Sequence, residues 1–360
     1  MQSAAATTTT PDDRPRFRYR RVLLGACAVV ALGLLAWLLG WDLRSWFSNL
    51  WDTLTSISLA SLVAGIAFQT LQTVLAAIAW YAILVVAYPG RVRRRTVIAC
   101  YATAVALNGV LPANLGTFVM LMMFTAVIAG ATFAGVVAGY LVHKIFFTIA
   151  GAFVYVYLFV SVGGSFDIKF EWLHEHPGAF AAIAGGVVVI VVVVGRAFWS
   201  KLRGLWSKAK EGGEILVHPR SYFLRVFLPE LGSWLSKLCV IAVFLAAYSI
   251  PVTFHTVMSV VGGNSIANVT SVTPGGAGVN QAFNVASLNG VTDATTATAY
   301  SIGQQLFTTA WNIVFASVLL VWVFGWTGGK ALVSDSYVKA KEKAAAEAAA
   351  RKERKAGEAV

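Results

Sequence analysis

The segment Ser271-Val-Thr-Pro-Gly-Gly-Ala-Gly-Val-Asn-Gln-Ala-Phe283 decides the fold, because it places helix-breaking residues inside a strongly apolar region. An earlier segment, Asn108-Gly-Val-Leu-Pro-Ala-Asn-Leu-Gly116, contains the same Pro-x-x-x-Gly spacing. Residues around the two segments recur 160 positions apart, as Tyr140 and Tyr300 do. Interrupted apolar segments at matching positions of two halves indicate a transporter-like repeat with a binding site between the halves. The alternative is that the Gly/Pro turns only permit tight helix packing.

The composition identifies an integral membrane protein. Hydrophobic residues make up 58% of the chain and charged residues 12%, whereas soluble domains contain about 25% charged residues. Apolar runs such as 179–194 and 307–324 approach or reach the roughly 20 residues that cross a bilayer as a helix. The alternating pattern of a membrane barrel is absent from the sequence, so the expected fold is all-α and polytopic.

The net charge of +12 does not indicate a nucleic-acid partner, because the basic residues cluster just outside apolar segments. The cysteines Cys27, Cys100 and Cys239 have no metal-type spacing. We therefore expect no metal site, no disulfide framework and no cofactor.

The basic clusters also predict the topology. We expect a disordered, basic cytoplasmic N-terminus at 1–21, a membrane transport domain at 22–326, and a charged cytoplasmic tail at 327–360 that is a solvated helix or disordered. The transport domain is expected to contain about six full spans and two helical re-entrant hairpins, with repeats at about 96–162 and 252–324. Since the basic clusters then lie on one side, the hairpins enter from opposite sides and the repeats have inverted topology. Hairpins that cross fully would preserve the same orientation.

Ionisable residues within the spans are the first site candidates, since charges are costly in a membrane. Lys144 and Lys237 fall near the middle of their spans, and we predict that they line a substrate path. Glu230 has either a functional role or an ordinary interfacial ion pair, while His143 points off the Lys144 face and is assigned to packing. Two lysines against one glutamate leave a net positive cavity, which suits a phosphate group.

Helix breaks strengthen this prediction, because helix N-terminal amides and Gly-rich turns bind anions. The remaining predicted substrate-binding residues come from the broken segments and from the helices that follow them: Asn108, Pro112, Asn114, Asn268, Pro274, Gly275, Gly276, Gly278, Asn280, Gln281, Tyr140, Tyr300 and Gln304. No catalytic residue is assigned.

The segment Thr273–Gln281 resembles the Pro-Gly-Gly-x-Gly-x-x-Glu signature of the lysylphosphatidylglycerol synthase transmembrane, or flippase-like, family. The segment Asn108–Gly116 is similar to that family's Asn-x-x-x-Pro-x-x-x-Gly segment. The chain departs from the family at Asn114, where Arg is common, at Thr117, where an acidic residue is common, and at Gln281, where the signature has Glu. The resemblance implies a bacterial or archaeal inner-membrane protein that moves a phosphate-containing lipid or a polyprenyl-linked sugar.

The expected function is therefore lipid transport or flipping rather than catalysis, by a multi-pass protein of the cytoplasmic membrane with both termini in the cytoplasm. The expected ligand is an anionic phospholipid or a polyprenyl-phosphate-linked lipid, and a lipid-synthesis enzyme or a second copy of the chain is the candidate protein partner. We expect no aminoacyltransferase domain after the spans. Two alternatives stay open: an intramembrane lipid-modifying enzyme, such as a lipid-linked glycosyltransferase or phosphatase, and a non-transporting partner of a lipid synthase.

Overall fold

The computed structural model describes residues 57–111, 115–161, 214–270, 273 and 276–357, which all belong to one compact unit, Thr53–Val360. Within these ranges every regular element is a helix. The predicted N-terminus, the apolar runs at 22–40 and 179–194, and four predicted site residues lie outside them; these residues are Pro112, Asn114, Pro274 and Gly275.

The first half of the described chain contains α3 (Leu59–Ala87), α4 (Arg94–Val110), α5 (Leu115–Val127) and α6 (Phe133–Ser161). The second half contains the short elements η1 (Glu214–Val217), α10 (Pro219–Tyr222) and the π-helical turn η2 (Phe223–Phe227), and then α11 (Leu228–Ala247), α12 (Phe254–Thr270), α13 (Val279–Ser287) and α14 (Ala294–Gly357).

Four helical stretches are long and apolar enough to cross a membrane: Leu59–Ala87, Phe133–Leu158, Pro219–Ala247 and Ala294–Lys343. The last of these stretches contains the apolar run predicted at 307–324. The chain is thus an all-helical, multi-pass membrane protein, as predicted. The helices α4 and α12 have 17 residues each, and α5 and α13 have 13 and 9, so each is at or below the lower limit for a full crossing.

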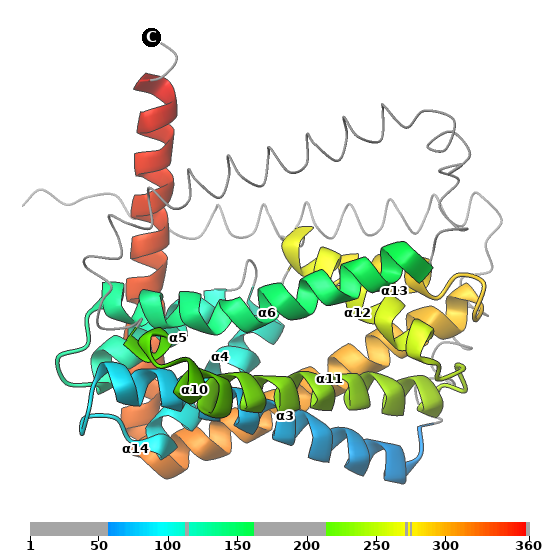
Figure 1. Cartoon of the computed structure of the whole chain (residues 1–360), viewed down its shortest axis with the longest axis horizontal. Helices are drawn as coiled ribbons and strands as arrows, with labels where there is room; N and C mark the ends of the chain where they lie inside the picture. Colours follow the sequence, from blue (N-terminus) through cyan, green and yellow to red (C-terminus); the bar gives the residue numbers. More distant parts are fainter. Residues whose placement is uncertain (1–56, 112–114, 162–213, 271–272, 274–275, 358–360) are drawn as a thin grey trace, which may run out of the picture. The chain divides into compact units, whose positions relative to one another are not determined.

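The long helices alternate in direction (Figure 1). Helices α3 and α11 are antiparallel, because Gly65 near the start of α3 faces Phe244, and Leu75 farther along faces Gly232. The Ser233 hydroxyl donates to the Gln72 carbonyl oxygen at 2.9 Å and links the two helices between these points. Small residues at the crossing allow this close packing, which stabilises helix pairs in lipid.

The hairpin α4–α5 begins and ends at one end of the unit, because Arg91 Nη1 donates to the Ala129 carbonyl oxygen at 3.2 Å. We call this the basic end, since it holds Arg91–Arg95 and also the segment with Arg220 and Arg225, which packs against the last turns of α3. The hairpin α12–α13 begins at the opposite end, where the Phe254 ring lies 4.9 Å from the ring of Tyr157, close to the end of α6.

Helix boundaries correspond between the two halves. Helices α3 and α11 end 160 residues apart, and both ends of α4 and α12 are 160 residues apart. The turns after α5 and α13 each contain a glycine with φ +79°, Gly130 and Gly290. This left-handed conformation favours glycine, so the two turns share a backbone requirement.

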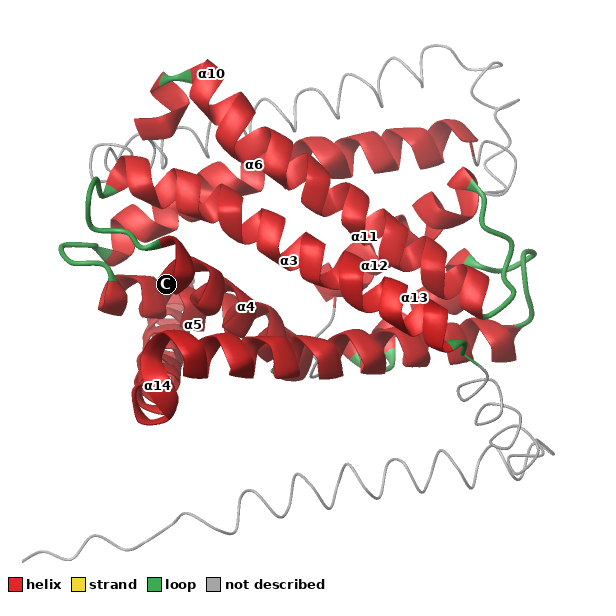
Figure 2. Cartoon of the chain, turned by 90° about the horizontal axis from the view of Figure 1, so that it is seen from below, coloured by secondary structure: helices red, strands yellow, loops and turns green. Residues whose placement is uncertain are grey.

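A buried cluster of described residues surrounds the first hairpin. Its bulky members include Trp80, Leu84, Val97, Met123 and Phe124. Helix α14 runs along α4 and α5 (Figure 2), so a helix of the second half covers the hairpin of the first. Helix α6 contacts α12 in the corresponding way.

Helix α14 is interrupted at Gly325, whose φ of 72° and ψ of 167° are not helical. The part after Gly325 leaves the direction of the spans (Figure 1). It packs at the basic end, where Ala340 is fully buried in the cluster and Lys343 Nζ lies 3.1 Å from the Phe133 ring centroid. The predicted tail is thus helical to Gly357, and one face of its first part is packed while residues such as Lys330 and Val338 are exposed.

Asp293 caps the start of α14, and we predict that this cap depends on pH. Its carboxylate accepts hydrogen bonds from the Thr296 hydroxyl at 2.6 Å and the Thr296 backbone N–H at 2.9 Å, and these bonds lower the pKa of Asp293. The lowered pKa means that the stabilisation is complete above the ordinary pKa of about 3.9 and is lost as the pH falls through the folded value. Asp293→Ala should cost about 1 kcal/mol at pH 7 and less at pH 3, measured by thermal unfolding.

The matched control for this cap is Asp293→Asn, which keeps the acceptor without a titrating group. The stability difference between Asp293→Asn and Asp293→Ala should be the same at both pH values. A wild-type advantage over Asp293→Ala that is undiminished at pH 3 would contradict the charge-dependent cap.

Candidate functional site

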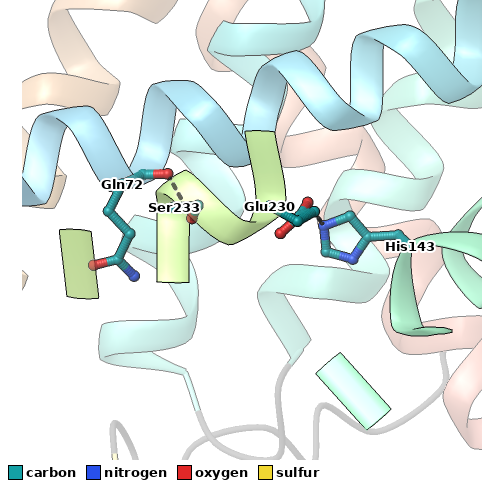
Figure 3. A network of polar contacts seen from close by, with 4 residues as sticks. All are labelled: Gln72, His143, Glu230 and Ser233. Carbon is teal, nitrogen blue, oxygen red and sulfur yellow. Dashed lines mark hydrogen bonds and ion pairs between the residues drawn. The ribbon is translucent and has the colours of Figure 1, made fainter. Parts of the chain in front are cut away.

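His143 and Glu230 form a buried ion pair between α6 and α11 (Figure 3). His143 Nε2 lies 2.7 Å from Glu230 Oε1, and the two side chains are 6% and 0% exposed. The contact lacks the alignment of a hydrogen bond, and it is a charged pair when the imidazole is protonated. Both residues lie about 15 Å along their spans from the basic end, at 1.5 Å per residue. A charged pair at this depth is a functional candidate by default.

Aromatic rings enclose the histidine. The ring centroids of Trp80 on α3, Phe147 on α6 and Tyr101 on α4 lie 5.0, 5.2 and 6.5 Å from the imidazole centroid. The pair is therefore in a low-dielectric environment, where a partnered charge interacts strongly and an unpartnered one is costly.

Several polar atoms around the pair have no hydrogen-bond partner among the described residues: His143 Nδ1, Glu230 Oε2 and the Tyr222 hydroxyl. Tyr101 and Tyr222 lie within electrostatic range of Glu230. Since buried polar atoms are normally hydrogen-bonded, these atoms mark a place with unused capacity to bind a polar group. No third His, Cys, Asp or Glu joins the pair in the described helices, so those residues alone do not form a metal site.

Asn108 holds the first hairpin closed at its turn. Its Nδ2 donates to Thr117 Oγ1 at 3.1 Å, and its Oδ1 accepts from the Thr117 backbone N–H at 3.2 Å. Gly116 permits this approach, because a Cβ there would lie 2.5 Å from the Ala104 carbonyl oxygen. The amide of Asn108 is thus committed to the hairpin itself.

Gln281 lies in the second hairpin, near the start of α13. Its Oε1 accepts from the Gly278 backbone N–H at 2.6 Å, and its Nε2 donates to Gln305 Oε1 at 2.7 Å. Gly278 has φ +83° and Gly276 has φ +73°, so the turn uses the left-handed conformations that favour glycine. Gln281 thereby joins the turn of the hairpin to α14.

Asn280 and Asn268 are the other predicted amides in this region. The side chain of Asn280 is partly buried and lies against Gly276. Asn268 is in the last turns of α12, where the structure describes the backbone alone.

The two predicted lysines lie on different helices, Lys144 on α6 and Lys237 on α11. Lys144 is exposed, and its Nζ lies 5.1 and 5.5 Å from the ring centroids of Tyr140 and Phe147. Lys237 is partly buried on α11. The structure places Lys144 one residue from the ion pair, on a different face of α6.

Tyr300 and Gln304, predicted as the counterparts of Tyr140 and Lys144, lie on α14. Tyr300 is fully buried, with its ring edge-on to Tyr248 at 6.1 Å. Gln304 is partly buried, and its neighbour Gln305 makes the contact to Gln281.

Sequence reasoning missed the partnership of His143 with Glu230. The available signal was their equal depth: each lies about 10 residues from the basic end of an apolar span. Two ionisable residues of opposite sign at one depth are candidates for pairing in a membrane.

The model of a protein family, the lysylphosphatidylglycerol synthase TM region, matches residues 24–317. The match includes both hairpins and the His143–Glu230 pair, and it confirms the resemblance predicted from the two motifs. No curated protein and no solved structure matches the chain.

Proposed function

The chain belongs to the lysylphosphatidylglycerol synthase transmembrane family, and on that basis we propose that it moves a phosphate-containing lipid or a polyprenyl-linked intermediate across the cytoplasmic membrane. The headgroup passes between the two hairpins while the apolar chains stay in the bilayer. The basic end faces the cytoplasm, following the positive-inside rule.

The observation that carries this proposal is the correspondence of the two halves. The first residues of helices α4 and α12 are 160 positions apart in the sequence, and so are their last residues. The two helices begin at opposite ends of the unit. This arrangement supports an inverted-topology repeat, the plan of many secondary transporters. The helix that follows each hairpin, α6 or α14, packs against the hairpin of the other half, so rocking of one half against the other would alternate access.

The charges of α6 and α11 favour an anionic headgroup. The described parts of these helices contain Lys144, Lys237 and His143 against one carboxylate, Glu230. An excess of cationic groups at membrane depth stabilises a phosphate in transit and disfavours a cationic headgroup.

Reconstituted protein tests the proposal directly. Proteoliposomes containing the full chain should accelerate transbilayer movement of fluorescent phosphatidylglycerol or a polyprenyl phosphate, measured by dithionite quenching, relative to protein-free vesicles. Mass spectrometry should recover the lipid unchanged, which separates transport from lipid modification. If none of these lipids moves faster with the protein present, the proposal fails.

Lys237→Met should slow transport of the anionic lipid by about tenfold, because a charge-assisted contact contributes about 1.5–3 kcal/mol. Lys330→Met is the matched control: Lys330 is exposed and lies after the interruption at Gly325. Equal transport rates for both variants would show that Lys237 does not contribute to the transport path.

A further inference from the structure

A second, separate feature lies at the basic end. A groove of about 990 Å³ opens between the start of α4, the end of α5 and the part of α14 before Gly325. Its charged and aromatic lining consists of Arg91, Arg93, Arg94, Arg95, Trp322 and Phe324. None of these residues belongs to the His143–Glu230 site.

The four arginines are exposed. None of them forms an ion pair with a carboxylate in the described part of the chain. Arg91 makes one hydrogen bond, to the Ala129 carbonyl oxygen. Four exposed arginines therefore line the groove, and most of their guanidinium donors have no hydrogen bond among the described residues. The guanidinium fork binds phosphate through two parallel hydrogen bonds, which an ammonium group cannot do.

An apolar surface adjoins these charges. Trp322 is 62% exposed, and the Arg95 guanidinium lies 4.9 Å from its ring centroid. Val314, Val318 and Val321 are also exposed and lie on the same stretch of α14. Tryptophan with adjacent apolar residues is typical of the headgroup level of a membrane, with acyl chains below it.

We propose that this groove binds the phosphate-bearing headgroup of an anionic phospholipid, with its acyl chains along the exposed valine face of α14. The arginines bind the phosphate and Trp322 lies against the glycerol region. This binding does not depend on the proposed transport, since the groove is open to one membrane face and is complete without a change in the hairpins. If the arginines served only as topology signals, any other cationic residue could replace them.

Native mass spectrometry of the purified full chain tests the site, with phosphatidylglycerol as probe and phosphatidylcholine and inorganic phosphate as comparisons. Arg93→Gln/Arg95→Gln should weaken phosphatidylglycerol binding at least tenfold. Arg220→Gln/Arg225→Gln removes the same charge from the same end, outside the groove, and should leave the affinity unchanged. Equal losses in the two double variants would overturn the proposal in favour of general surface charge.

Arg93→Lys/Arg95→Lys keeps the charge and the topology signal, so it keeps the proposal testable if the Gln variant fails to insert. We expect this variant to bind phosphatidylglycerol several-fold more weakly than wild type, and Trp322→Leu to lose two- to threefold. Wild-type affinity in the Lys variant would overturn the arginine site. Inorganic phosphate that competes with the lipid at equal concentration would assign the groove to free phosphate instead.

Discussion

Replacing His143 with Leu is expected to lower the free energy of unfolding by about 3–5 kcal/mol, because it leaves Glu230 fully buried without its counter-ion. An unpaired carboxylate is costly in an apolar core, because no counter-ion offsets its desolvation. Thermal unfolding of the detergent-solubilised protein measures the loss.

The opposite replacement should cost less. Glu230→Gln replaces the carboxylate with a neutral amide of similar shape, which can still accept a hydrogen bond from the imidazole. The double variant His143→Leu/Glu230→Gln should recover much of the stability lost in His143→Leu, because no buried charge remains. A double variant as unstable as His143→Leu would show that the ring is needed for packing against Trp80 rather than for pairing.

Gly116→Ala is the second substitution with a large expected effect. The added methyl would lie 2.5 Å from the Ala104 carbonyl oxygen and 2.7 Å from the Asn108 backbone nitrogen. Both atoms belong to the backbone of α4 and cannot rotate away, so α5 must move and its bonds to Asn108 must lengthen. We expect a loss of about 1–3 kcal/mol, measured by thermal unfolding.

Gly151→Ala is the matched control for this substitution. Gly151 lies within α6, and a Cβ there meets nothing within 4 Å. Alanine should therefore stabilise the helix by about 0.5–1 kcal/mol. If the two alanine variants unfold at the same temperature, the close approach of α4 and α5 does not limit stability.

The fold could be predicted where its signals are local. Apolar run length predicted the spans, and Pro and Gly predicted the breaks between α4 and α5 and between α12 and α13. These properties need no knowledge of which helices are neighbours. The family could also be predicted, because its signatures are short continuous segments such as Thr273–Gln281.

The site was less predictable, because it depends on which helix faces meet. His143 and Glu230 are 87 positions apart in the sequence, and their contact follows from the packing of α6 and α11 around Trp80. Neighbouring helix positions differ by about 100° in direction, which separates Lys144 from His143 and Gln304 from Gln305. A repeat in the sequence shows which positions correspond, but it does not show which side chains surround each position.

The interruption at Gly325 has a mechanical consequence. Before it, α14 is covalently continuous with the second hairpin; after it, the same chain is fastened beside the first hairpin through Ala340 and Lys343. The C-terminal helix thus connects the two halves across Gly325. A Cβ added at Gly325 would meet no atom within 4 Å, so no neighbouring group restricts bending there. If the halves separate at the basic end, either the backbone must rotate at Gly325 or the helix after it must lose its contacts through Ala340 and Lys343.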